Sequence, residues 1–145
     1  ISYTTICRVI EKIEPFEGAA AFLENMRGRF QLVILSDTFY DFASPLMPKL
    51  GNPFLLCHRM TILEDRIVGY RLRQEDPKTH AVRSLQSLNL RVIAAGDSFN
   101  DVGMLNQANK GFFFNAPVSI TARFPMIETV ANYTRLAERL SEFSD

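Results

Sequence analysis

Arg91-Val92-Ile93-Ala94-Ala95-Gly96-Asp97-Ser98-Phe99-Asn100-Asp101 is an apolar run that breaks into a glycine and then two carboxylates four residues apart. Its first half is short, partly β-branched and uncharged after Arg91, as is typical of a strand buried on both faces of a parallel sheet. Ligands of such sheets bind outside the carboxyl ends of the strands. The stretch therefore predicts a metal- and phosphate-binding edge, although a plain strand, turn and N-capped helix is an alternative that this segment alone leaves open.

Helical and strand patterns alternate through the rest of the chain. Helices are predicted over residues 3–13, 18–26, 39–50, 77–88, 98–108 and 133–143, and strands over residues 31–35, 54–63, 67–73, 91–95 and 111–114. Pro45 and Pro48 are expected to kink or divide the third helix. The turn residues 64–66 predict a protruding β-hairpin. We therefore expect one α/β domain over residues 1–145, with a Rossmann-like parallel sheet, flanking helices and a hairpin flap.

Composition excludes several classes of partner. The chain has 145 residues, 47% of them hydrophobic, and 16 basic residues balance 16 acidic ones without a run of five like charges. This balance predicts neither nucleic acid nor a membrane surface as a partner. No apolar run approaches the roughly 20 residues that span a bilayer, so we expect a cytoplasmic protein. Cys7 and Cys57 lack the spacing of a zinc site and are expected to be buried free thiols.

Three kinds of polar group follow strands or begin helices. Ser36 supplies a hydroxyl after the strand over residues 31–35, Lys78 lies in the first turn of a helix, and Asp97 and Asp101 follow the strand over residues 91–95. Phosphoryl transfer needs donors and a positive charge on the phosphate oxygens and a divalent cation to neutralise developing charge. Ser36 with the two amides after it, Lys78, and Mg²⁺ held by Asp97 would meet these needs. Each residue alone is also explained as a helix cap or a solvated side chain.

At these residues the chain resembles the haloacid dehalogenase superfamily of aspartate-nucleophile phosphatases, whose second, third and fourth motifs correspond to Ser36, Lys78 and residues 96–101. Within it, the chain is similar to the phosphoserine phosphatases, and most of all to bacterial members that are also homoserine phosphotransferases. Residues 33–40, 56–58, 68–74 and 92–98 carry this likeness. Asp37 and Thr38 stand where a typical phosphoserine phosphatase has glycines, which favours the bacterial subgroup.

The resemblance implies a role for each motif residue. Ser36, Asp37, Thr38, Lys78 and Asn100 would bind phosphate, Lys78 would also bridge phosphate and nucleophile as a catalytic residue, Asp97 would ligate Mg²⁺ directly, and Asp101 would hold the waters around the metal. It implies a magnesium-dependent hydrolase or phosphotransferase of serine biosynthesis that acts on a small phosphorylated amino acid, phosphoserine, with homoserine as a further acceptor. A homodimer is compatible with it.

The family's first motif, a carboxylate pair after an N-terminal strand, has no counterpart before Ile13. We therefore expect a partial core that lacks the nucleophile, the central strand and the helical cap, and that is inactive alone; the nucleophilic aspartate would lie outside this chain. The alternative is a catalytically inactive phosphate-binding or interaction module. A response-regulator receiver fits less well, because its lysine ends a strand before a proline, whereas here Pro77 precedes Lys78 and a helix follows.

Overall fold

The computed structural model describes residues 1–143 and divides the chain into two compact units, Ile1–Glu75 and Asp76–Asp145, which are described separately. Each unit contains parallel strands and helices, so the α/β prediction is confirmed. The prediction of a single domain over residues 1–145 stays a prediction. Among the described residues, no helix combines the length and the hydrophobicity needed to cross a bilayer.

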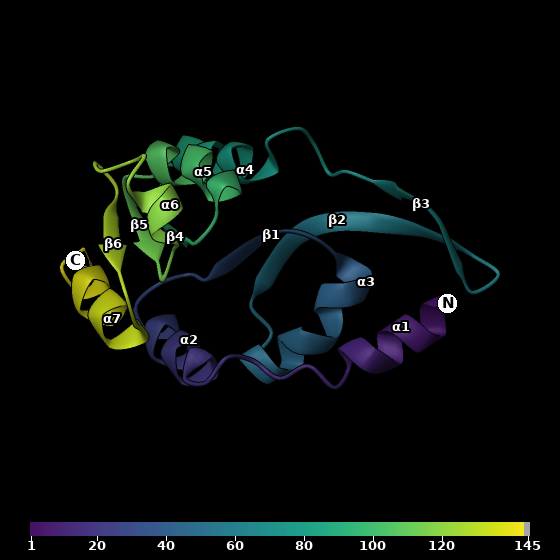
Figure 1. Ribbon diagram of the computed structural model, residues 1–145. Coiled ribbons are helices and arrows are strands. Elements are labelled where there is room, and N and C mark those ends of the chain that lie inside the picture. The colour runs from purple at the N-terminus through teal and green to yellow at the C-terminus, as the bar shows by residue number, and fades with distance from the viewer. Residues whose placement is uncertain (144–145) are drawn as a thin grey trace. The chain divides into compact units, whose positions relative to one another are not determined.

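The first unit is built on a three-stranded sheet in the order β1-β2-β3 (Figure 1). Strand β1 runs parallel to β2, and β2 runs antiparallel to β3. Its elements are α1 (Tyr3–Ile10), α2 (Ala19–Arg27), β1 (Val33–Phe39), α3 (Tyr40–Ala43), the 3₁₀ helix η1 (Ser44–Leu50), β2 (Phe54–Leu63) and β3 (Arg66–Arg71). The predicted helix over residues 39–50 is thus divided, since Pro45 lies at the start of η1 and Pro48 inside it.

Strand β1 is longer than predicted and contains a bulge. Leu35 pairs with Leu56 and Phe39 pairs with His58, so three residues of β1, 36–38, face a single residue of β2. The prediction ended this strand at Leu35, because Ser36 begins a polar run that is typical of a turn. The polar residues instead remain in the strand but leave the regular ladder, as bulged residues do.

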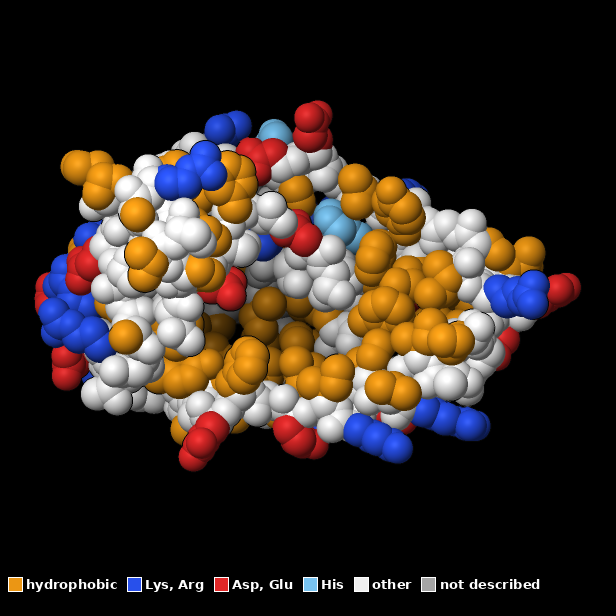
Figure 2. Space-filling model, viewed as in Figure 1, with side chains coloured by type: hydrophobic (Ala, Val, Ile, Leu, Met, Phe, Trp, Pro, Cys, Tyr) orange, Lys and Arg blue, Asp and Glu red, His pale blue; other side chains and the backbone are white. Residues whose placement is uncertain are grey.

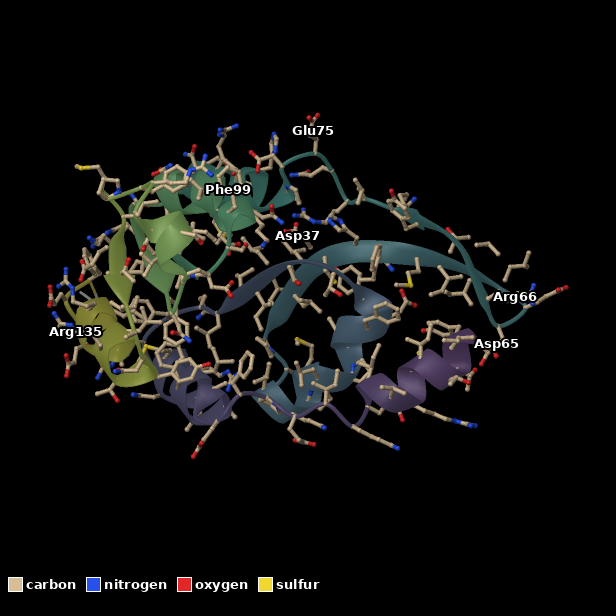
Figure 3. The ribbon with its side chains drawn as sticks, viewed as in Figure 1. Asp37, Asp65, Arg66, Glu75, Phe99 and Arg135 are labelled. Atoms are coloured by element: carbon tan, nitrogen blue, oxygen red, sulfur yellow. The ribbon has the colours of Figure 1, made fainter. Side chains whose placement is uncertain are left out.

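The hairpin of β2 and β3 turns at Glu64 and Asp65, whose φ angles of 49° and 60° suit a tight two-residue loop. Figure 3 shows Asp65 and Arg66 at the far end of the hairpin. The Asp65 carboxylate accepts hydrogen bonds from the backbone N–H and the hydroxyl of Thr4, both at 2.7 Å, and thereby caps α1. The predicted hairpin is therefore confirmed, and its turn also holds the start of a helix.

Hydrophobic side chains gather on the visible face of the first unit (Figure 2). The exposed large hydrophobic residues of the hairpin and of the segment just after it are Phe54, Leu63, Ile67, Val68, Tyr70 and Leu72. The buried side chains of this unit include Met26 and Cys57, each 1% exposed. Cys57 and the half-buried Cys7 are both free thiols.

The second unit has a three-stranded, fully parallel sheet in the order β4-β5-β6. Its elements are α4 (Pro77–Ser87), β4 (Ile93–Gly96), the 3₁₀ helix η2 (Phe99–Asp101), α5 (Val102–Gln107), β5 (Lys110–Phe114), α6 (Val118–Thr121), β6 (Glu128–Val130) and α7 (Tyr133–Ser141). The prediction missed α6 and β6, since segments of four and three residues are too short to show a periodicity.

Strand β5 forms the centre of the second unit. Phe112 and Phe113 are fully buried, and Val82 of α4, Leu105 of α5 and Leu136 of α7 are at most 3% exposed. Helices α4, α5 and α7 thus each bury an apolar side chain within this unit. The amphipathic pattern predicted for residues 133–143 is confirmed by the burial of Leu136, although α7 ends at Ser141.

Candidate functional site

The loop after β4 turns sharply at Gly96. A Cβ atom at this position would lie 2.5 Å from Cγ of Asp101 and 2.6 Å from its Oδ2. Any side chain there would displace the Asp101 carboxylate, because real Cβ atoms essentially never approach so closely. Gly96 is therefore required by the close approach of Asp101 to the end of the strand.

The Asp101 carboxylate is the structural centre of this loop. Its Oδ2 accepts hydrogen bonds from the backbone N–H groups of Asp97 and Ser98 and from the Ser98 hydroxyl, each at 3.0 Å. Its Oδ1 accepts a hydrogen bond from Nζ of Lys78 at 2.7 Å. Four donors thus surround a side chain that is 7% exposed, and the Lys78 side chain is 12% exposed. A buried carboxylate with this many donors is held firmly in its ionised form.

The electrostatics of Asp101 follow from these contacts. Burial acts to raise the pKa of Asp101, but the hydrogen bonds from Lys78 and Ser98 and the charge of Lys78 outweigh it, so the pKa lies below its ordinary value. Since both oxygens already accept hydrogen bonds, Asp101 fixes the loop and Lys78 rather than offering an open coordination position. This geometry suits the predicted role of Asp101, which is to hold the waters around the metal and not to ligate the metal itself.

Asp97 differs from Asp101 in being exposed. Within residues 1–143 its carboxylate makes no hydrogen bond or ion pair, and Asn100 beside it is exposed as well. The same described residues contain no group of three or more His, Cys, Asp or Glu side chains that could hold a metal. Mg²⁺ keeps several of its waters and needs only one or two carboxylates from a protein, so a single open carboxylate fits this ion and would not fit zinc.

The second group of predicted site residues lies in the bulge of β1. The hydroxyl oxygen of Ser36 accepts a hydrogen bond from the backbone N–H of Thr38 at 3.3 Å. Asp37 is exposed at the middle of the bulge, near the carboxyl end of β1 (Figure 3). The predicted phosphate cradle had both amides after Ser36 pointing at the anion, whereas here the Thr38 amide is engaged locally. A bound anion would have to replace the Ser36 oxygen as its acceptor.

His58 is not among the site residues predicted from the sequence. It is 5% exposed, and its Nδ1 accepts a hydrogen bond from the backbone N–H of Arg73 at 3.0 Å. Its Nε2 lies 3.8 Å from Oδ1 of Asp37. The signal in the sequence that could have identified it is its place in the stretch 56–58, which carries part of the family resemblance.

The structure brings the predicted residues together in two groups. Lys78, Asp97, Asn100 and Asp101 belong to the second unit, where Lys78 reaches the loop after β4 across 2.7 Å. Residues 36–38 belong to the first unit, where His58 joins them. Lys78 begins α4 as predicted, and Thr79 beside it is buried.

Comparison with known proteins places these motifs in one family. A family model described as "haloacid dehalogenase-like hydrolase" matches residues 2–109. Phosphoserine phosphatase ThrH of Pseudomonas aeruginosa is 52% identical over 132 residues, which are 90% of this chain and 64% of that protein. A phosphoserine phosphatase of Pseudomonas syringae pv. tomato is 48% identical over 138 residues, or 94% of this chain and 58% of that protein. The chain thus spans about three fifths of the length of these relatives.

Solved structures share the fold. A phosphoserine phosphatase from T. onnurineus in complex with NDSB-201 superimposes with a TM-score of 0.75 at 23% identity, over 95% of this chain and 64% of that one. A phospho-aspartyl intermediate analogue of phosphoserine phosphatase gives a TM-score of 0.76 at 18% identity, over 89% of this chain and 64% of that one. At these identities the likeness concerns the arrangement of helices and strands.

Proposed function

Because the chain belongs to the haloacid dehalogenase-like hydrolases, we propose that it is the larger part of a phosphatase that hydrolyses phosphoserine with the help of Mg²⁺. The observation that carries the proposal is the loop after β4. There both oxygens of Asp101 accept hydrogen bonds from Lys78 and the loop, while the Asp97 carboxylate is exposed at the carboxyl end of β4. The two Pseudomonas relatives support phosphoserine as the substrate.

Asp97 would hold the metal, and Asp101 would hold the loop around it. When bound, Mg²⁺ supplies positive charge that neutralises the oxygens of the phosphoryl group. Asp101 keeps the backbone of Asp97 in place through its 3.0 Å hydrogen bond and keeps Lys78 extended toward the loop. A fixed donor costs no reorganisation when charge develops in the transition state.

The residues of the bulge would contact the phosphate itself. Ser36 offers a hydroxyl donor and Asp37 a backbone amide, and the Thr38 amide would join them once the anion replaced the Ser36 oxygen as its acceptor. Lys78 offers a charge-assisted hydrogen bond, which is stronger than a neutral one. The nucleophilic aspartate is proposed to lie outside residues 1–145. Strands β1 and β4 are edge strands of their sheets, so a further strand could pair with either of them. This arrangement supports the proposal.

The proposal is tested with the natural gene product that contains this chain. We expect phosphoserine hydrolysis that requires Mg²⁺ and that falls by at least about a hundredfold in Asp97→Asn, because loss of one charge-stabilising group typically costs two to three orders of magnitude in turnover. Glu17→Gln, at an exposed carboxylate of the first unit, is the matched control and should keep its turnover.

Calorimetry with inorganic phosphate separates the outcomes. Phosphate binding without hydrolysis of any phosphomonoester would replace the proposal by the inactive phosphate-binding module. Ordinary turnover of Asp97→Asn in Mg²⁺ would remove the metal role of this residue. Transfer to homoserine, a place in serine biosynthesis, a homodimer and a cytoplasmic location stay predictions.

A further inference from the structure

The bulge of β1 lacks the regular ladder that fixes the conformation of its neighbours. Residues 36–38 lie opposite one residue of β2, so their amides do not follow the pairing of the strand on either side. Groups that bind an anion must nevertheless be held in one arrangement, because each misplaced donor weakens binding and lowers rate. Side-chain contacts must therefore supply the order that the ladder does not.

His58 is placed to supply this order. It lies directly opposite Phe39, the residue that ends the bulge, and the Phe39 ring meets the imidazole edge-on with centroids 6.1 Å apart. Its Nδ1 accepts a hydrogen bond from the backbone N–H of Arg73 at 3.0 Å. Since that nitrogen is an acceptor, the proton of the neutral ring is on Nε2. The donor of His58 therefore faces the Asp37 carboxylate at 3.8 Å.

The Asp37 carboxylate needs such a partner if the bulge binds phosphate. A carboxylate beside a phosphate dianion repels it, and the repulsion is strong where the surroundings are only partly solvated. An N–H donor on β2 that attracts the carboxylate keeps it turned toward that strand and leaves the backbone amides for the anion. At 3.8 Å the contact is longer than a hydrogen bond, and contacts of this kind often tighten once the ligand is bound.

We infer that His58 is a positioning residue, which acts through Asp37 to hold the bulge of β1 in its phosphate-binding form. The inference rests on the proposed function and adds a residue to it. His58 also joins three segments: the bulge, its own strand β2, and the segment after β3 that contains Arg73. Its burial, at 5% exposed, keeps the imidazole in one orientation.

Two substitutions, made in the natural gene product that contains this chain, separate the roles of the two imidazole nitrogens. His58→Asn keeps an acceptor near the position of Nδ1 for the Arg73 amide but is too short to reach Asp37. His58→Gln extends an amide donor toward Asp37 and gives up the acceptor for Arg73. In His58→Asn we expect the KM for phosphoserine and the inhibition constant of inorganic phosphate to rise about 5- to 20-fold, the effect of one hydrogen bond to a charged group. The kcat should change less than about threefold.

The KM of His58→Gln should lie close to the wild-type value and well below that of His58→Asn. A merely structural role of His58 would not predict this difference. In an Asp37→Ala background, His58→Asn should have no further effect on KM, since the residue acts through Asp37. His80→Asn, at the exposed histidine of α4, is the control for the change of residue type and should leave KM unchanged. Should His58→Asn not fold, Asp37→Ala carries the test: the loss of the contact that orders the bulge is expected to outweigh the relief of charge repulsion, so KM must rise.

An active His58→Asn variant with unchanged KM and phosphate inhibition would overturn the inference, as would an equal effect of His58→Asn with and without Asp37. A wild-type protein that neither hydrolyses phosphoserine nor binds phosphate would instead defeat the proposed function. The two failures are distinguished by the wild-type measurement alone.

Discussion

The ammonium group of Lys78 donates to Oδ1 of Asp101 across 2.7 Å and ties the first turn of α4 to the loop after β4. Both side chains are nearly buried. The lysine is at the start of a helix, where the helix dipole disfavours a cation, so the carboxylate offsets an intrinsic cost. The pair therefore contributes to stability as well as to the candidate site.

Lys78→Met should lower the free energy of unfolding by about 2 to 4 kcal/mol, because it leaves a buried carboxylate without its charged partner. Urea unfolding measures this difference. The double variant with Asp101→Asn should lose less than the sum of the two single losses, since the residues are in contact. Arg135→Met, which removes an exposed ion pair with Glu138, is the control and should cost less than about 1 kcal/mol. Additive losses at positions 78 and 101 would contradict the pairing.

The contribution of Asp101 should depend on pH. Its folded-state pKa lies below the ordinary value, so the stabilisation is present above the unfolded-state pKa of about 4 and is lost as pH falls through the folded-state value. The difference in unfolding free energy between wild type and Asp101→Asn should thus be constant near neutrality and shrink below about pH 4. A difference that stays constant down to the acid unfolding transition would show that the charge of Asp101 is not what stabilises the loop.

Gly96→Ala should disrupt the loop, because the new Cβ would lie 2.5 Å from Cγ of Asp101. We expect a loss of about 2 kcal/mol or more, in the range of overpacked sites, together with reduced activity of the complete protein. Gly28→Ala is the matched control, since its Cβ would meet Asn25 O at 3.7 Å, an ordinary van der Waals contact. Thermal unfolding of both variants checks the prediction; equal melting temperatures would mean that the loop adapts.

Glu128 links β6 to α7 and β5. It accepts two hydrogen bonds from Arg139, at 2.7 and 2.9 Å, and lies 3.2 Å from Nζ of Lys110. The Arg139 hydrogen bonds are the main cause that lowers the pKa of Glu128 from 4.5 to about 2. Glu128→Gln should therefore cost stability at neutral pH, by about 1 kcal/mol given the partial exposure of the carboxylate.

That cost should vanish as pH falls from 4.5 to about 2, through which the folded-state carboxylate protonates. Unfolding of wild type and Glu128→Gln between pH 2 and 7 measures it. Glu138→Gln, which alters only an exposed pair on α7, serves as the control. A cost that persists unchanged at the acid end would indicate lost side-chain contacts rather than lost charge.

The sequence predicted those parts of the fold whose signals are local. The run before Gly96 identified β4, the turn at residues 64–66 identified the hairpin, and the prolines at 45 and 48 identified the divided helix. The contact of Lys78 with Asp101 was not predicted, since the residues are 23 positions apart and no periodicity links them. Their residue types and their places at helix starts made them candidates.

Other features depend on contacts that no local pattern encodes. The bulge of β1 arises from its register against β2, and a strand's register is set by its partner. The place of His58 beside Asp37 follows from that same register. Strand β6 has only three residues and exists because it pairs with β5. An alternation of apolar and polar residues over only three positions cannot be distinguished from chance.

Strand β2 divides its length between two neighbours, with Phe54–Leu56 and His58 in register with β1 and Arg59–Leu63 in register with β3. The outer half can therefore be lengthened, shortened or exchanged with that of another hairpin while the pairing beside the bulge is retained. Such grafts should succeed in steps of two residues on each strand, because a single-residue step would turn every following side chain to the opposite face. The chain thus contains a natural junction at which hairpins of different lengths could be joined to the strand pair that is proposed to bind phosphate.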